Sequence, residues 1–262
     1  MVGHEGQPVI ALEALRRIGE FAHFALLGFG AAVAALPRPS RWLRPFYAVF
    51  VGGIPMAVVL GLALGAVIWL QTRAVLEQFP GANDLLPTVL TAAVLLELAP
   101  VGAGLIVAAR TGASLGAELS SMKLGEQVDA LELLGQSPRR VLVGPRILAC
   151  LLAAPLLHVL VSLLAIGSSF ASEALAGTGN WLKYSGAVEA ELANRLSEVI
   201  LAGLKPVVFG GLIGAMGCWV GLRADGGSEG VGRAATDSVV KCSLLVLAAD
   251  VLLVGVIRFA LR

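Results

Sequence analysis

Residues 97–146 read ELAPVGAGLIVAARTGASLGAELSSMKLGEQVDALELLGQSPRRVLVGPR and decide the fold. The run begins as the second half of a membrane helix, which Pro100 breaks and which is expected to end at Arg110. A cytosolic segment rich in small residues follows, and its short amphipathic helix is predicted from Glu126 to Gly135. A soluble amphipathic helix held between two membrane spans indicates a surface for a cytosolic partner.

Two stripes run along this predicted helix. Apolar residues at helical spacing form the first stripe: Leu124, Val128, Leu131 and Leu134. Acidic residues three apart form the second stripe: Glu126, Asp129 and Glu132. The simpler interpretation is that the acids form a solvated face, and composition alone favours it.

The same stretch resembles the central signature of the MlaE/YrbE permease family, the membrane subunit of the ABC transporters that work with MCE proteins. The matching residues are Glu97-Leu98-Ala99-Pro100-Val101, Ala109-Arg110-Thr111-Gly112-Ala113, Ala117-Glu118-Leu119, Met122, Glu126-Gln127-Val128-Asp129-Ala130, Gly135, Pro138 and Pro145-Arg146. A second match, GGSEGVGRAAT, lies at 226–236. Two residues depart from the family pattern: Ala99 replaces a glycine, and Gly125 stands where a threonine often caps the helix.

The resemblance implies a permease subunit that moves phospholipid or a related lipid between the inner membrane and a periplasmic MCE protein. Five spans with one docking helix make half of a transporter, so a second copy of the chain is implied as partner. A cytosolic ABC ATPase is expected to bring ATP and Mg²⁺, and this chain is expected to bind no cofactor. The coupling helix would dock the ATPase through these residues: Glu126, Gln127, Asp129, Leu131, Glu132 and Leu133.

Composition places the chain in lipid. Of its 262 residues, 57% are hydrophobic and 14% charged, whereas soluble domains carry about 25% charged residues. The net charge of +1 argues against a nucleic-acid partner. The three cysteines are isolated and the three histidines scattered, so the sequence predicts neither a disulfide framework nor a metal site.

Residues 9–36 mix apolar residues with charges. A secretory signal peptide is one interpretation, because Arg16-Arg17 precede an apolar run. Glu20 and His23 fall where that apolar region should begin, which favours an amphipathic helix in the membrane interface. A basic elbow follows at 37–45.

Five segments approach the ~20 apolar residues that a bilayer core requires. They are about 46–70, 86–109, 147–170, 196–221 and 239–260, within a single permease domain over 1–262. Lysine and arginine are concentrated on one side, which predicts an N-in, C-out topology with the coupling segment 111–145 in the cytosol. The outer loop is expected at 171–195. Glycines at close spacing predict tight helix packing: Gly61, Gly65, Gly210, Gly214, Gly217 and Gly221.

Three ionisable residues fall inside predicted spans: Glu97, Lys205 and Asp250. Intramembrane charges are costly, so these residues either line a substrate cavity or form structural ion pairs such as Glu97 with Lys205. Pro100 would leave the carbonyl of Leu96 without its helical partner and bend the span beside Glu97. If these three charges carry ions, the alternative function is that of an ion-coupled secondary lipid transporter.

Further basic residues are expected at the inner headgroup level, where anionic lipid attracts them: Arg110, Arg139 and Arg140. A new helix is predicted to start at Ser137-Pro138. The glycines of 226–232 lack the GKS or GKT ending of a Walker A loop, so this chain is not expected to bind nucleotide. The resemblance to an ABC permease implies that the ATPase is another chain. An intramembrane enzyme is disfavoured, because no catalytic constellation can be assembled.

Overall fold

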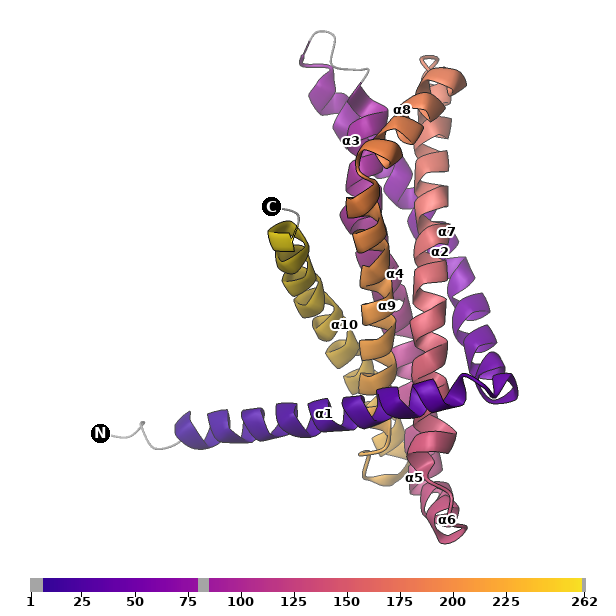
Figure 1. The fold of residues 1–262 in the computed structure, drawn as a ribbon, viewed down its shortest axis with the longest axis vertical. Coiled ribbons are helices and arrows are strands. Elements are labelled where there is room, and N and C mark those ends of the chain that lie inside the picture. Colours follow the sequence, from indigo (N-terminus) through magenta and orange to yellow (C-terminus); the bar gives the residue numbers. More distant parts are fainter. Residues whose placement is uncertain (1–6, 80–84, 261–262) are drawn as a thin grey trace.

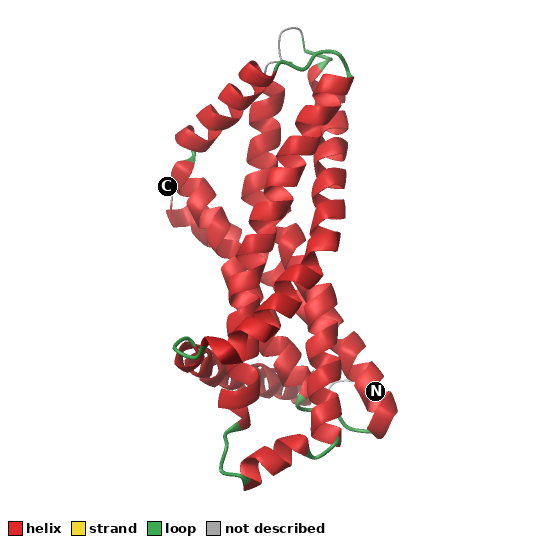
Figure 2. Ribbon diagram, turned by 90° about the vertical axis from the view of Figure 1, so that its right-hand side faces the viewer, coloured by secondary structure: helices red, strands yellow, loops and turns green. Residues whose placement is uncertain are grey.

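The computed structural model describes residues 7–79 and 85–260, and these residues form helices with no strand (Figures 1 and 2). Six of the described helical segments are long and apolar enough to cross a membrane. The chain is therefore an all-α integral membrane protein.

The α-helices in chain order are α1 (Gln7–Ala35), α2 (Pro39–Leu76), α3 (Leu86–Ala93), α4 (Ala99–Val107), α5 (Ala113–Leu124), α6 (Gln127–Leu133), α7 (Gly144–Leu175), α8 (Trp181–Asn194), α9 (Leu196–Gly221) and α10 (Gly227–Ala260). Three π-helical turns join some of them: η2 (Val94–Leu98), η3 (Ala108–Gly112) and η4 (Arg139–Val143). Each π-turn contains a charged residue singled out in the sequence. These are Glu97, Arg110, Arg139 and Arg140.

The long helices form a bundle. Helices α2, α7 and α9 run side by side, together with the continuous rod from α3 to α5 (Figure 1). The α6 helix lies beyond one end of this bundle, and α3 and α8 lie at the other. Helix α10 packs on α5 and α9 through its first half and then leans away from the bundle.

Helix α1 lies across the other helices near the α6 end (Figure 1). Glu20 accepts a 2.8 Å hydrogen bond from Arg223, and Trp219 packs against Phe21 and Phe24 of α1. The position of α1 in the membrane interface stays a prediction. The apolar part of α1 is also long enough to span a bilayer, and it is the sixth such segment beside the five expected.

The second long helix does not end at Arg110. It passes through η3 and continues as α5 to Leu124, with Leu119 and Ser120 fully buried. A Cβ at Gly116 would lie 2.6 Å from the carbonyl oxygen of Ala234, so the small residues allow α10 to approach closely. The small-residue segment that the sequence places in the cytosol is thus largely packed into the bundle.

The expected outer loop and the glycine-rich stretch near residue 230 are both helical. The outer loop at 171–195 contains α8, whose Asn180 caps the helix by accepting from the backbone N–H of Lys183. Tyr184 anchors α8 to Ser169 of α7 at 2.5 Å. Burial raises the pKa of the Tyr184 phenol, so the hydroxyl stays protonated. The glycine-rich stretch at 226–236 forms the first turns of α10.

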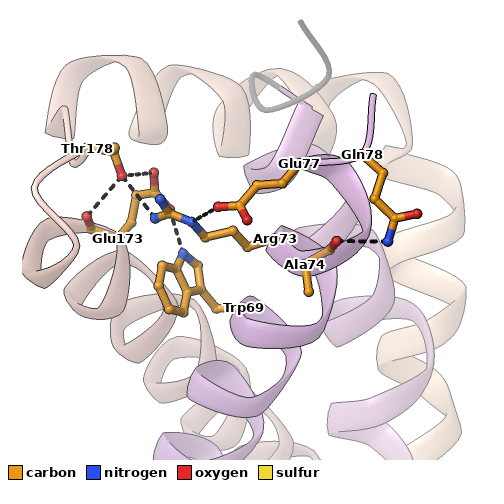
Figure 3. A network of polar contacts seen from close by, with 7 residues as sticks. All are labelled: Trp69, Arg73, Ala74, Glu77, Gln78, Glu173 and Thr178. Carbon is orange, nitrogen blue, oxygen red and sulfur yellow. Dashed lines mark hydrogen bonds and ion pairs between the residues drawn. The ribbon is translucent and has the colours of Figure 1, made fainter. Parts of the chain in front are cut away.

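Helices α2 and α7 are tied together at the α8 end by a polar network (Figure 3). The indole N–H of Trp69 donates to Glu173, and Arg73 lies 4.0 Å from the same carboxylate. Arg73 also donates to Glu77 at 2.8 Å and to Thr178 at 3.3 Å. Sequence analysis did not predict this network, because Glu173 falls in the expected loop.

The predicted glycine faces are real contact faces. A Cβ at Gly210 would clash with the carbonyl oxygen of Cys150, and one at Gly214 would lie 2.8 Å from the Cα of Ile147. Gly217 and Gly221 instead face Leu115 and Leu119 of α5. Helix α9 therefore uses one half of its glycine stripe against α7 and the other half against α5.

Replacing Gly210 with alanine should lower the free energy of unfolding by about 1–3 kcal/mol, because the added methyl overpacks the α7–α9 contact. Gly203→Ala on the same helix is the matched control, since nothing lies within 4 Å of its Cβ position. Thermal unfolding in detergent compares the two variants. Equal midpoints would contradict the contact.

Candidate functional site

The three intramembrane charges meet at one point. Lys205 of α9 lies 2.7 Å from Glu97 of η2 and 3.3 Å from Asp250 of α10. The Lys205 side chain is 2% exposed, whereas Glu97 is 45% exposed and Asp250 17%. A single buried cation therefore joins three helices, and one of its two carboxylates is open to the surroundings.

Pro100 explains part of this geometry. A proline at this position cannot donate to the carbonyl four residues earlier, and that carbonyl belongs to Leu96. Lys205 Nζ donates to the Leu96 oxygen at 3.1 Å, in addition to its bond with Glu97. The carbonyl that the proline leaves free is thus satisfied by the buried lysine, as a low-dielectric interior requires.

A cavity of about 260 Å³ opens beside Glu97 and Lys205. It also contains three charged residues that sequence analysis did not select: Arg195, Glu198 and Arg258. Glu198 lies two helical turns before Lys205 on α9, and Arg258 about two turns after Asp250 on α10. Helical periodicity from Lys205 was the signal that could have found Glu198, which lies on the same helix.

This cavity places charges of both signs at the wall of an apolar bundle. Such an arrangement suits the charged headgroup of an amphiphile, whose chains remain among apolar side chains. Among the described residues, no group of three His, Cys, Asp or Glu side chains is placed to hold a metal.

The second candidate site is α6, beyond the end of the bundle. Its acids are exposed, and Asp129 pairs with Lys123 at 2.8 Å. Glu126 precedes the helix with φ 57°, a left-handed conformation that is costly for a residue other than glycine. Gly135, with φ 69°, lies in the turn that follows the helix.

The apolar side of α6 differs from the predicted stripe. Val128 is buried and Leu131 half-buried against the bundle, but Leu134 is 73% exposed. Leu133 is 90% exposed. The helix ends at Leu133, so Leu134 is not held on the packed face. Two neighbouring exposed leucines beside three exposed acids form a surface suited to a protein partner.

The basic residues expected at the headgroup level lie apart from the Lys205 cavity. Arg139 and Arg140 are exposed on η4, immediately after the helix start at Pro138. Arg110 lies on η3 with its guanidinium against Gly52 of α2. The structure brings Glu97, Lys205 and Asp250 together but leaves these arginines near the other end of the bundle.

The sequence profile of the permease MlaE family matches residues 42–256 of this chain. The chain belongs to the MlaE permease family. A probable ABC transporter permease of Rickettsia typhi is 32% identical over 240 residues, covering 90% of both chains. A similar protein of Rickettsia felis is 34% identical over 236 residues, covering 88% of this chain and 89% of the relative.

A plant protein extends the MlaE similarity. The chloroplast protein trigalactosyldiacylglycerol 1 of Arabidopsis thaliana is 35% identical over 175 residues, which are 66% of this chain and 49% of that protein. Membership of the MlaE family makes this chain the permease subunit of an ABC transporter, and such a subunit implies an ATPase partner.

Proposed function

We propose that this permease moves phospholipid or a related lipid, as a homodimer driven by a separate cytosolic ATPase. The observation that carries the proposal is the Lys205 cluster, where a buried cation and an open carboxylate line a cavity in an apolar bundle. The name of the Arabidopsis relative refers to a galactolipid, which supports a lipid substrate.

The exposed surface of α6 is the proposed ATPase contact. Glu126, Asp129 and Glu132 would face basic residues of the ATPase, and Gln127, Leu131 and Leu133 complete the coupling surface. Leu133 supplies apolar area at the centre of that surface. ATP and Mg²⁺ would bind to the ATPase.

A second copy of the chain would pack against α10. This helix leans away from the bundle and exposes apolar side chains along its free half, including Val251 and Val256. In the dimer the two Glu97 cavities would open toward the space between the protomers. An MCE-domain protein would lie at the α8 end, on the periplasmic side of the inner membrane.

A mild-detergent pull-down of the tagged chain from its native membrane tests this function. The proteins recovered are identified by mass spectrometry, and we expect a Walker-containing ATPase together with an MCE-domain protein. Recovery of the chain alone, still dimeric, would contradict the ABC arrangement. Lipid movement in vesicles that needs a pH gradient but no ATP would then establish the ion-coupled alternative.

A further inference from the structure

A second cavity lies far from Lys205, at the level where α1 crosses the bundle. Its volume is about 560 Å³, and it is enclosed by the start of α2, the η3–α5 segment and the η4–α7 segment. Its charged lining consists of Arg41, Arg44, Arg110, Arg146 and Glu118. Four arginines and one glutamate give this lining a net charge of +3.

Only one of these arginines is neutralised within the described part of the chain. Arg146 pairs with Glu118 at 2.7 Å and donates to the carbonyl of Leu142 at 2.8 Å. Arg41, Arg44 and Arg110 make no ion pair or side-chain hydrogen bond with another described residue. Three guanidinium groups without a counter-charge around one cavity are a site for an anion, and arginine binds phosphate oxygens in a bidentate manner.

The position of Arg110 depends on a glycine. The guanidinium occupies the space that a side chain at Gly52 would fill, so the missing Cβ lets it lie against α2. The π-turn η3 that carries Arg110 breaks the regular helix at this point, and such turns are frequent at functional sites.

A separate apolar groove lies further along α2, between α2 and α4. It has a volume of about 620 Å³ and is lined only by apolar residues: Pro55, Met56, Val59, Leu60, Ala63, Gly102, Leu105 and Ile106. One face of α2 lines both the cavity and the groove. At helical spacing this face carries Val49 of the cavity, then Gly52, and then Met56 and Ala63 of the groove. On the other wall, Ile106 lies one turn, about 6 Å, before Arg110.

The cavity and the groove together match one amphiphile. From Val49 to Ala63 the face of α2 extends about 21 Å, enough to cover the ~15 Å of one bilayer leaflet. We propose that this is a lipid site, in which the arginine cavity holds a phosphate-bearing headgroup and the α2–α4 groove holds an acyl chain. The site is separate from the Lys205 cavity and requires only that the chain lies in a membrane.

Binding is tested on the purified, delipidated chain in detergent, by native mass spectrometry and by the shift of the thermal unfolding midpoint. The probes are dioleoyl phosphatidate, dioleoylglycerol and inorganic phosphate. Phosphatidate should bind at least about tenfold more tightly than dioleoylglycerol, which has the same chains without the phosphate. Inorganic phosphate alone should shift the midpoint little. An equal shift with inorganic phosphate, or equal binding of the two lipids, would overturn the proposal.

The variant Arg44→Gln/Arg110→Gln should weaken phosphatidate binding by about tenfold for each lost arginine. Arg233→Gln/Lys241→Gln removes the same charge from exposed residues of α10 outside the cavity and should retain most of the affinity. Should the first variant fail to fold, Arg110→Lys keeps the charge but loses the bidentate geometry, and it should still weaken binding.

A third variant tests the groove. Ala63→Phe should weaken binding of dioleoyl phosphatidate while leaving the six-carbon dihexanoyl form unaffected, because only the longer chain reaches this point. Unchanged binding in both the arginine variants and Ala63→Phe would exclude the site. No assay here contains ATP or a partner, so the result is independent of the proposed transport function.

Discussion

Replacing Lys205 with methionine should both destabilise the bundle and suppress lipid transport. The substitution removes the cation between Glu97 and Asp250, so both carboxylates lose their counter-charge and the Leu96 carbonyl loses its donor. Breaking a buried pair costs about 3–5 kcal/mol, and we expect the lower end of this range because Glu97 is 45% exposed. Thermal unfolding in detergent measures this loss.

Transport in the same variant should fall on the order of tenfold or more, since the positive charge beside the cavity that would attract an anionic headgroup is lost. Transport is measured in vesicles that contain the permease and its ATPase. Lys205→Arg retains the charge and is expected to keep part of the stability and part of the transport activity.

A triple variant separates the structural from the functional role of these charges. Glu97→Gln/Lys205→Met/Asp250→Asn removes all three charges together, and replacing a whole buried ionic group by neutral residues is often neutral for stability. We expect stability to recover while transport stays low. Transport at the rate of the unmodified protein in the triple variant would show that the charges serve only the fold.

Reversing the acids of α6 should abolish recovery of the ATPase with the permease. Glu126→Lys/Asp129→Lys/Glu132→Lys places like charges against a complementary surface, which costs several kcal/mol and weakens binding more than about 100-fold. The fold should persist, because the three acids are exposed and the Asp129–Lys123 pair is worth at most ~1 kcal/mol. Co-purification in mild detergent is the measurement.

Two controls accompany this variant. Glu189→Lys reverses an exposed acid on α8 at the opposite end and should leave the complex intact. Leu133→Ser tests the apolar part of the surface, and since Leu133 is 90% exposed its loss should weaken the complex without changing the unfolding midpoint. Normal recovery of the complex from the triple reversal would refute docking through α6.

Much of the architecture follows from local rules. The apolar segments and the small-residue spacing predict a helical membrane protein with close contacts at Gly65 and Gly210. The chemistry of proline predicts the free carbonyl of Leu96. The possible pairing of Glu97 with Lys205 followed from their opposite charges inside the membrane. None of these inferences needed knowledge of which helices are neighbours.

The remaining features depend on contacts between distant segments. The hydropathy pattern predicted that a span ends at Arg110. The helix continues beyond this residue because α5 packs on α9 and α10. The contribution of Arg195 and Arg258 to the Lys205 cavity depends on how α9 and α10 are arranged around it. The arginine cavity likewise joins residues of α2, η3 and η4 that no single periodic pattern connects.

The π-helical turns have a geometric consequence for the rod from α3 to α5. In a π-turn the hydrogen bond spans one residue more than in an α-helix, and each additional residue rotates the following side chains by about 100°. With η2 and η3 in one rod, α3, α4 and α5 have three different angular phases. The rod can therefore turn one face to α8, another to α7 and a third to α10 while it remains one continuous helical segment.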